Sequence, residues 1–331
     1  PYFVINYSEN KNVSSITSGI DSGKTFYIFH NTRNYPNKYL KRLVLLSKEL
    51  ISKINNKFLD IEFAFTKNNE LILFQVRSLK IYDKKNADLS FAIKNIKKRF
   101  IKANINHPDL LGNKTIFGIM PDWNPAEIIG LYPRPLSLSL YKELITDGIW
   151  AYQRDNYGYR KLRSFPLLID LMGLPYVDVR VSFNSFIPKS LPNTVAEKLS
   201  NYYLKKLEKK PFLHDKIEFD IVFSCFTFSL DSKLKKLSKL NFSSSEILQI
   251  SNSLKKLTNS IINSNDGIWK RDLVKINKLE DRLNIILNNK KFDLNEKIYW
   301  LVEDCKRYGT LPFAGLARAG FIAMQILDSL H

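Results

Sequence analysis

Residues 59–77, LDIEFAFTKNNELILFQVR, alternate apolar and polar side chains on either side of a short polar stretch. Alternation with a period of two is typical of a β-strand that buries one face, and a polar turn between two such runs is typical of a hairpin. The pattern therefore predicts a β-hairpin. In its first strand we expect one face to carry Ile61, Phe63 and Phe65 and the other to carry Asp60, Glu62 and Ala64. In its second strand we expect one face to carry Leu71, Leu73, Gln75 and Arg77.

This hairpin is expected to place Glu62, Gln75 and Arg77 in a row. A carboxylate, an amide and a guanidinium within two otherwise apolar strands are costly to bury unless they meet a ligand. A carboxylate and an amide oxygen suit Mg²⁺, and a guanidinium suits a phosphate. The row therefore points to a nucleotide site. Spacing alone leaves a second interpretation open, in which the hairpin is a sheet edge whose polar side faces water.

The chain carries a net charge of +19, from 51 lysines and arginines against 32 aspartates and glutamates. The basic residues are spread widely and no recognised nucleic-acid-binding motif accompanies them, so we expect no nucleic-acid partner. Phosphates or anionic substrates explain the charge more economically. The length of 331 residues, of which 44% are hydrophobic, indicates about two globular domains.

Cellular location is predicted from two cysteines and from hydropathy. Cys225 and Cys305 lie far apart without metal-type spacing, so we expect a reducing, cytoplasmic setting. No apolar run approaches the roughly 18 residues that a membrane span needs, so we expect no membrane partner. The sequence begins at Pro1 directly before a predicted strand and stops inside a predicted helix, which predicts a piece of a longer protein.

The fold class expected from these patterns is α+β, in two parts joined by a connector. Residues 1–80 alternate predicted strands (2–7, 24–30, 59–66 and 70–77) with one helix at 37–55. Residues 81–115 are predicted to be the connector, with one helix near 88–103. Residues 116–331 are predicted to form a mostly helical domain with a small sheet. Its predicted helices are 124–130, 137–152, 194–208, 243–264, 268–289, 293–307 and 314–330, and its predicted strands are 176–183 and 216–223. Capping pairs predict four of the helix starts: Asn124 with Glu127, Thr194 with Glu197, Ser243 with Glu246 and Asp293 with Glu296.

Five of the thirteen arginines fall within 47 residues and alternate with tyrosines. They are Arg134, Arg154, Arg160, Arg163 and Arg180. Arginine binds carboxylate and phosphate in bidentate fashion, and tyrosine adds flat apolar surface with a hydroxyl. The segment therefore suggests a pocket for an anionic or polyhydroxylated acceptor. The alternative is that these arginines pair with Asp155, Asp170 and Asp178 as structural clamps.

Other polar or glycine-rich segments favour structural roles. Asp122, Asn124 and Glu127 form a polar cluster that helix capping largely explains. The small residues of Gly309–Gly320 indicate close helix packing more than phosphate binding, since the spacing is not that of a dinucleotide motif. His30, His107 and His214 show neither metal spacing nor a nucleophile partner.

The hairpin LDIEFAF…LILFQVRSL resembles the end of the ATP-grasp domain in the phosphoenolpyruvate synthase and pyruvate phosphate dikinase family. PYFVINY followed by SSITSG is similar to the strand and turn that precede it. The resemblance implies that Glu62 and Gln75 coordinate Mg²⁺–ATP and that Arg77 contacts phosphate. It also implies that Thr17, Ser18 and Gly19 line the nucleotide cleft. Ser78 stands where the family usually has Pro.

The second part resembles the region between the ATP-grasp and phosphohistidine domains of phosphoenolpyruvate-synthase-like and rifampin-phosphotransferase-like proteins. GIMPDWNPAEIIG, YPRPLSLSLY, RDNYGYRKLRSFP, PYVDVRVSFNSFIP and RYGTLPFAGLARAGFIA carry this similarity. It implies a central fragment of an ATP-dependent phosphotransferase that contributes part of the Mg²⁺–ATP site and an acceptor-binding domain.

The partners that this resemblance implies are a nucleotide, a small-molecule acceptor, and two further parts of the same full-length chain. Those parts are an N-terminal ATP-grasp lobe and a domain whose histidine carries the phosphoryl group. No catalytic residue is expected within this chain. Arg134, Arg160, Arg163 and Arg180 are the predicted acceptor-binding residues. The alternative function is a non-catalytic binding or scaffold module with a degenerate ATP-grasp half.

Overall fold

The computed structural model describes residues 2–8, 23–79, 89–163 and 165–330. The chain divides into two compact units, Pro1–Asp88 and Leu89–His331. The first boundary lies close to the predicted end of the nucleotide-binding part at residue 80. Residues 89–115, predicted as a connector, belong to the second unit, where Leu110 and Leu111 are buried in its apolar cores.

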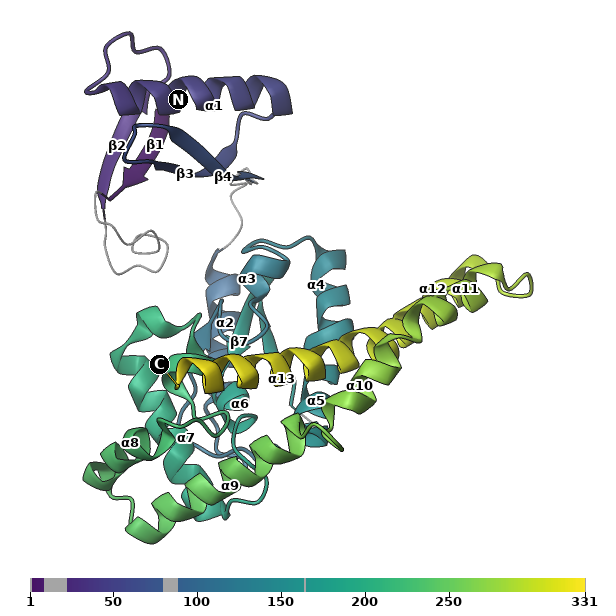
Figure 1. Cartoon of the computed structure of the whole chain (residues 1–331). Helices are drawn as coiled ribbons and strands as arrows, with labels where there is room; N and C mark the ends of the chain where they lie inside the picture. The colour runs from purple at the N-terminus through teal and green to yellow at the C-terminus, as the bar shows by residue number, and fades with distance from the viewer. Residues whose placement is uncertain (1, 9–22, 80–88, 164, 331) are drawn as a thin grey trace. The chain divides into compact units, whose positions relative to one another are not determined.

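The described residues of the first unit form two antiparallel strand pairs and one helix (Figure 1). β1 (Tyr2–Tyr7) pairs with β2 (Lys24–Phe29), and β3 (Leu59–Phe65) pairs with β4 (Leu71–Ser78). Helix α1 (Lys38–Ile54) begins after Asn37, whose side chain accepts a hydrogen bond from the backbone N–H of Leu40. Its apolar face packs with the strands in one core. That core comprises Ile5, Ile28, Leu40, Leu43 and Val44, with Phe63, Phe65 and Leu71 packed against it. The predicted strands and helix of this unit are confirmed to within two residues.

A bulge in the 59–78 hairpin corrects the predicted face of its second strand. Glu62 lies opposite Gln75, but the next residue, Phe63, lies opposite Leu73, so Phe74 is an extra residue on β4. Cross-strand partners share a face, and one extra residue reverses the side-chain alternation. Leu71 and Leu73 therefore share the face of Phe65 and Phe63, whereas Gln75 and Arg77 share the opposite face with Glu62 and Asp60. The prediction that Leu71, Leu73, Gln75 and Arg77 lie on one face is wrong.

The second unit combines a small antiparallel sheet with many helices (Figure 1). The sheet order is β5 (Phe117–Gly118), β7 (Leu174–Asp178) and β6 (Leu168–Leu171). The helices up to residue 209 are α2 (Leu89–Ala103), α3 (Pro125–Ile128), α4 (Pro135–Tyr141), α5 (Ile149–Asn156), α6 (Val179–Asn184) and α7 (Asn193–Lys209). Those that follow are α8 (Leu230–Lys235), α9 (Ser244–Ile262), α10 (Trp269–Ile276), α11 (Leu279–Asn288), α12 (Leu294–Asp304) and α13 (Leu311–Asp328). This mixture of helices and small sheets is consistent with the α+β class.

Short 3-10 and π-helical segments, labelled η, link several of these helices. The π-helical ones are η1 (Lys142–Thr146), η3 (Ile217–Ile221) and η5 (Cys305–Thr310), and the 3-10 ones are η2 (Pro211–Leu213) and η4 (Lys236–Leu240). The predicted helix 137–152 is thus three segments, and 268–289 is two. The largest core of this unit surrounds α6 and α7, with Phe183, Phe186 and Tyr203 among its fully buried side chains.

Both strands predicted in this unit need correction. The strand predicted over 176–183 ends at Asp178, because its carboxylate accepts the backbone N–H groups of Arg180 and Val181 and so begins helix α6. The segment predicted as a strand over 216–223 forms η3 instead. Its buried residues Ile217 and Ile221 are four apart, which is the spacing of one helical face.

Two of the four predicted capping boxes form. Ser243 with Glu246 and Asp293 with Glu296 each make both reciprocal hydrogen bonds. Asn124 makes no cap bond, because its backbone is left-handed and its amide instead donates to the Glu127 carboxylate. Helix α7 begins at Asn193 after Pro192, so Thr194 lies inside the helix.

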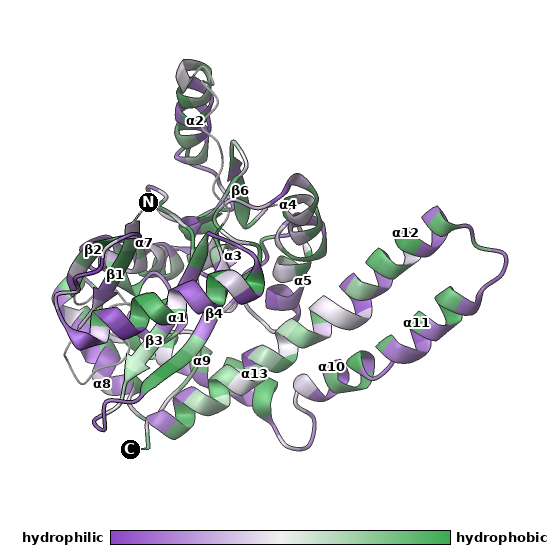
Figure 2. Ribbon diagram, turned by 90° about the horizontal axis from the view of Figure 1, so that it is seen from above, coloured by the Kyte–Doolittle hydropathy of each residue, from purple (hydrophilic) through white to green (hydrophobic). Residues whose placement is uncertain are grey.

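The helices after residue 278 include an antiparallel pair, α11 and α12, that extends away from the body of this unit in both views (Figures 1 and 2). Segment η5 joins α12 to α13 in one continuous helix, Leu294–Asp328. By length and composition alone this helix could cross a membrane, and 28% of its apolar window is buried within the structure. The expectation that no apolar run approaches the length of a membrane span is therefore wrong at this helix, whereas the cytoplasmic location and the lack of a membrane partner stay predictions.

Candidate functional site

The row of polar side chains predicted on the hairpin forms in the first unit. Glu62 and Gln75 are direct cross-strand neighbours. Arg77 donates from Nε to Gln75 Oε1 at 2.8 Å, and its Nη2 lies 3.5 Å from Glu62 Oε1. The bulge is what brings the three side chains together, because it places Gln75 and Arg77 on the same face as Glu62. This is the face that does not pack on α1.

The side chains of the row are exposed, so the expected cost of burying them does not apply within this unit. The side chains of Glu62 and Arg77 are 45% and 51% exposed, so within this unit neither charge pays the desolvation penalty of a buried group. The same exposure leaves the oxygens of Glu62 and Gln75 accessible to a cation. No group of three or more acidic, histidine or cysteine side chains suited to a metal occurs among the residues that the structure describes. Two oxygen ligands still fit Mg²⁺, which keeps several waters and takes further oxygens from phosphates.

The remaining residues of the predicted nucleotide site lie outside the described part of the chain. These are Thr17, Ser18 and Gly19. Their expected contact with a nucleotide stays a prediction.

The four arginines predicted to bind an acceptor hold different positions in the second unit. Arg180 is buried, and its guanidinium donates to the carbonyl oxygens of Gly112, Ala103 and Ile105. Arg163 pairs with Asp155 at 2.7 Å. Arg163 thus makes one of the ion pairs of the structural-clamp alternative. Arg180 also has structural contacts, but with carbonyl oxygens and not with the aspartates of that alternative.

Arg160 and Arg134 are less constrained. Arg160 donates from Nη1 to the side-chain oxygen of Asn193 at 2.8 Å. Arg134 is exposed at the start of α4. An acceptor role for these residues stays a prediction.

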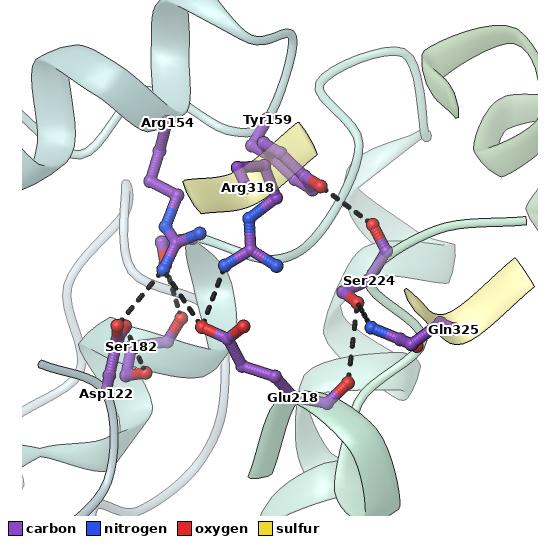
Figure 3. Close-up of polar contacts among 9 residues, drawn as sticks. Asp122, Arg154, Tyr159, Ser182, Glu218, Ser224, Arg318 and Gln325 are labelled. Atoms are coloured by element: carbon purple, nitrogen blue, oxygen red, sulfur yellow. Dashed lines mark hydrogen bonds and ion pairs between the residues drawn. The ribbon is translucent and has the colours of Figure 1, made fainter. Parts of the chain in front are cut away.

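A second polar site, buried in the second unit, joins four charged side chains that are far apart in sequence (Figure 3). Arg154 on α5 contacts Asp122 Oδ1 at 3.0 Å and Glu218 Oε1 at 3.6 Å. Arg318 on α13 contacts the same Glu218 oxygen at 2.7 Å. We call Asp122, Arg154, Glu218 and Arg318 the buried ion network. Because Glu218 lies on η3, the network ties α5, η3, α13 and the loop before α3 to one another.

Neighbouring polar and aromatic groups complete its surroundings. Ser182 donates to the second oxygen of Asp122 at 2.9 Å. The Arg154 guanidinium lies 4.2 Å from the centre of the Phe186 ring, and Arg318 lies 5.0 Å from the same ring. A guanidinium over an aromatic face is stabilised by the ring quadrupole, so Phe186 partly replaces water for both cations.

The two carboxylates of the network differ in their electrostatics. Burial raises the pKa of Asp122 above its usual value, against the opposing effect of the Arg154 guanidinium. Burial also acts to raise the pKa of Glu218, but Arg318 and Arg154 outweigh it and hold this pKa below its usual value. Glu218 is therefore the carboxylate that the two cations keep ionised.

Hydrogen bonding within the network is incomplete. Arg154 Nε, Glu218 Oε2, and Arg318 Nε and Nη1 are buried and find no hydrogen-bond partner in the described part of the protein. Unpaired buried polar atoms are costly, and bound water is the usual way in which proteins satisfy them. The network therefore has donor and acceptor atoms that bound water could satisfy.

Backbone strain lies directly beside it. Asp122, Trp123 and Asn124 have φ values of 47°, 59° and 35°, three consecutive non-glycine residues in the left-handed region. Each such residue costs on the order of 1 kcal/mol or more. Side-chain contacts hold this turn: the Asp122 carboxylate meets Arg154 and Ser182, and the Tyr141 hydroxyl donates to the Trp123 carbonyl at 2.6 Å.

Sequence reasoning singled out Asp122 and Arg154 but missed Glu218 and Arg318. Glu218 was missed because residues 216–223 were wrongly predicted to be a strand. Arg318 had a usable signal, since it is a lone charge within the apolar, small-residue sequence GLARAG. A charged residue among apolar helix positions is seldom buried without a partner, so its position could have predicted a buried acidic group elsewhere.

Comparison with family models, with curated proteins and with solved structures finds no match for this chain.

Proposed function

We propose that this chain is part of a phosphoenolpyruvate-synthase-like, ATP-dependent phosphotransferase. In this proposal the first unit is the C-terminal part of an ATP-grasp domain, and the Glu62–Gln75–Arg77 row is part of its Mg²⁺–ATP site. One observation carries the proposal: a carboxylate and an amide face each other across two strands, and a guanidinium reaches both. The resemblance of the hairpin sequence to that family supports it.

The chemistry of each side chain fits this role. Glu62 and Gln75 would hold Mg²⁺ through one oxygen each, and the ion would neutralise phosphate charge during transfer. Arg77 presents several N–H donors in a planar fork that suits phosphate oxygens. Its contacts with Gln75 and Glu62 keep the fork on the same face as the two oxygen ligands. The three side chains would thus position charges around the phosphates, and proteins catalyse phosphoryl transfer mainly by such positioning and charge stabilisation.

The second unit takes the role of the acceptor-binding part. Phosphoryl transfer through a histidine, with ATP giving its β-phosphoryl group, would require the ATP-grasp lobe and the phosphohistidine domain expected elsewhere in a full-length chain. Pyruvate or another small molecule would be the acceptor. Arg160 and Arg134 are the arginines of the predicted set whose side-chain positions best suit such contacts, because neither makes the multiple backbone contacts of Arg180.

A binding or scaffold module without catalysis is the second candidate. The observation that favours it is the exposure of the row, since Arg77 already satisfies Gln75 and Glu62 on an open face. An edge hairpin with its polar side in water would look the same.

The test is phosphorylation of the full-length gene product with ATP labelled at the β-phosphate. The proposal predicts an acid-labile, histidine-type label that is lost in Glu62→Ala and in Gln75→Ala. Glu70→Ala is the matched control, because Glu70 is exposed on the same hairpin but outside the row. Full labelling of both row variants would show that the metal-site assignment is wrong.

A further inference from the structure

A cavity of about 240 Å³ lies in the second unit between α7, η3, α8 and η4, with α13 contributing Gln325. It adjoins the buried ion network without being part of it: Glu218 points into the network, whereas its neighbours Phe219 and Asp220 line the cavity. Two residues that line the cavity, Ser224 and Gln325, contact each other beside Glu218 (Figure 3).

Positive charge dominates the cavity wall. Lys206, Lys233 and Lys236 line it, against one carboxylate, that of Asp220. Lys206 is partly buried and donates to the backbone carbonyls of Asp220 and Ile221, which fixes its ammonium group at the wall. Burial lowers the pKa of Lys206, Asp220 opposes this shift, and three neighbouring lysines reinforce it. The lysines therefore repel one another, and an anion between them would relieve that repulsion.

The rest of the wall offers an apolar surface and hydroxyl groups. Tyr202 and Phe223 lie nearly parallel, with ring centroids 6.2 Å apart and an interplanar angle of 15°. Ser224 and Thr227 are 1% and 5% exposed, so both hydroxyls are buried at the cavity wall. The Ser224 hydroxyl already donates to the Glu218 carbonyl and accepts from Gln325, and the Thr227 hydroxyl bonds to that of Ser229. The lysine ammonium groups are therefore the donors that suit the oxygens of a phosphate.

We propose that this cavity binds a small phosphate monoester whose flat, apolar body lies against Tyr202 and Phe223. Three lysines less one aspartate leave two positive charges, which match the charge of about −2 that a phosphate monoester carries at neutral pH. The aromatic pair provides the contact for the organic part of the ligand, and Lys233 and Lys236 provide the contact for its phosphate. This site is independent of the nucleotide site on the hairpin, so it stands whether or not that assignment holds.

Phenyl phosphate is the probe for the test, with inorganic phosphate and benzoate as separate arms, titrated into this chain by calorimetry. Binding of phenyl phosphate is expected to weaken about tenfold or more in the double variant Lys233→Gln/Lys236→Gln, since each charged hydrogen bond is worth about a factor of ten. Lys235→Gln/Lys239→Gln is the matched control: it removes the same charge from the same stretch of exposed helix, outside the cavity. The control is expected to bind within about twofold of the unmodified chain.

A second variant tests the aromatic wall. Tyr202→Leu is expected to weaken phenyl phosphate but not inorganic phosphate, because only the ester has a ring to lose contact with. The thermal midpoint of each variant, measured without ligand, shows whether that variant folds. If Tyr202→Leu does not fold, the two double-lysine variants decide the outcome. The proposal is overturned by any of three results: no phenyl phosphate binding at about 10 mM, equal losses in the two double-lysine variants, or benzoate binding as tightly as phenyl phosphate.

Discussion

Glu218 holds two arginines through one oxygen atom, and this sharing is what makes the buried ion network a single unit. Arg318 and Arg154 both contact Oε1, and the Arg154 Nη2 atom that contacts Glu218 also contacts Asp122. Two cations and two carboxylates balance in charge. Removing one member of such a set leaves an uncompensated buried charge, which is strongly destabilising. Replacing a whole buried ion pair by apolar residues of similar volume changes stability much less.

Glu218→Gln is expected to lower the free energy of unfolding by about 3–5 kcal/mol at pH 7. The folded state holds the pKa of Glu218 below its usual value, so its ionised form stabilises the fold above the unfolded-state pKa of about 4.3. This contribution is lost as pH falls below that value. Urea unfolding at pH 7 and at successively lower pH should therefore show the difference between variant and parent shrinking below pH ~4.3.

The matched control for this prediction is Glu208→Gln. Glu208 also pairs with a cation, Lys114, at 2.6 Å, but both side chains are about half exposed. Its loss is expected to cost less than about 1 kcal/mol. Equal destabilisation by the two substitutions would mean that the buried ion network does not act as described.

At the scale of elements, α13 shows how one glycine sets the distance between two helices. A Cβ atom added at Gly315 would overlap the Asp272 carboxylate of α10 and the Tyr157 ring. Asp272 accepts a hydrogen bond from the Tyr157 hydroxyl at 2.6 Å, so neither group can move aside freely. The close packing predicted for Gly309–Gly320 is thus confirmed at Gly315.

Gly315→Ala is expected to lower the free energy of unfolding by about 1–3 kcal/mol, because it overpacks this contact. Gly320 lies on the same helix with no atom within 4 Å of an added Cβ. Gly320→Ala is therefore expected to raise stability by about 0.5–1 kcal/mol through helix propensity. Thermal unfolding of the two variants measures both effects, and a stabilising Gly315→Ala would refute the close contact.

Element prediction succeeded where local pattern and tertiary environment agree. The strands at 2–7 and 59–65 and the helix at 38–54 bury the faces that their periodicity predicts. It failed at 179–184 and 217–221, where apolar and polar residues alternate in sequence but the backbone forms helical turns. In the first case a single side-chain cap at Asp178 decides the backbone, and in the second the tertiary core buries residues four apart. The bulge at Phe74 likewise depends on strand pairing, which alternation alone does not encode.

At the scale of the whole molecule, each of the two units carries one site for which we propose an anionic ligand, in a chain with a net charge of +19. The hairpin row combines Arg77 with the side-chain oxygens of Glu62 and Gln75, and three lysines line the cavity of the second unit. The row was predictable because its three residues are close in sequence and paired by a short turn. The cavity and the buried ion network were not, because their members come from segments far apart in sequence; the contact between Glu218 and Arg318 alone joins residues 100 positions apart.

The central claim is that the Glu62–Gln75–Arg77 row binds Mg²⁺–ATP, and the most direct measurement is the Mg²⁺–ATP dissociation constant of the full-length gene product. Glu62→Ala is expected to weaken binding about tenfold or more, because it removes the one carboxylate ligand in the row. Glu70→Ala, on the same hairpin, is expected to leave the dissociation constant unchanged. Unaltered Mg²⁺–ATP affinity in Glu62→Ala would contradict the claim.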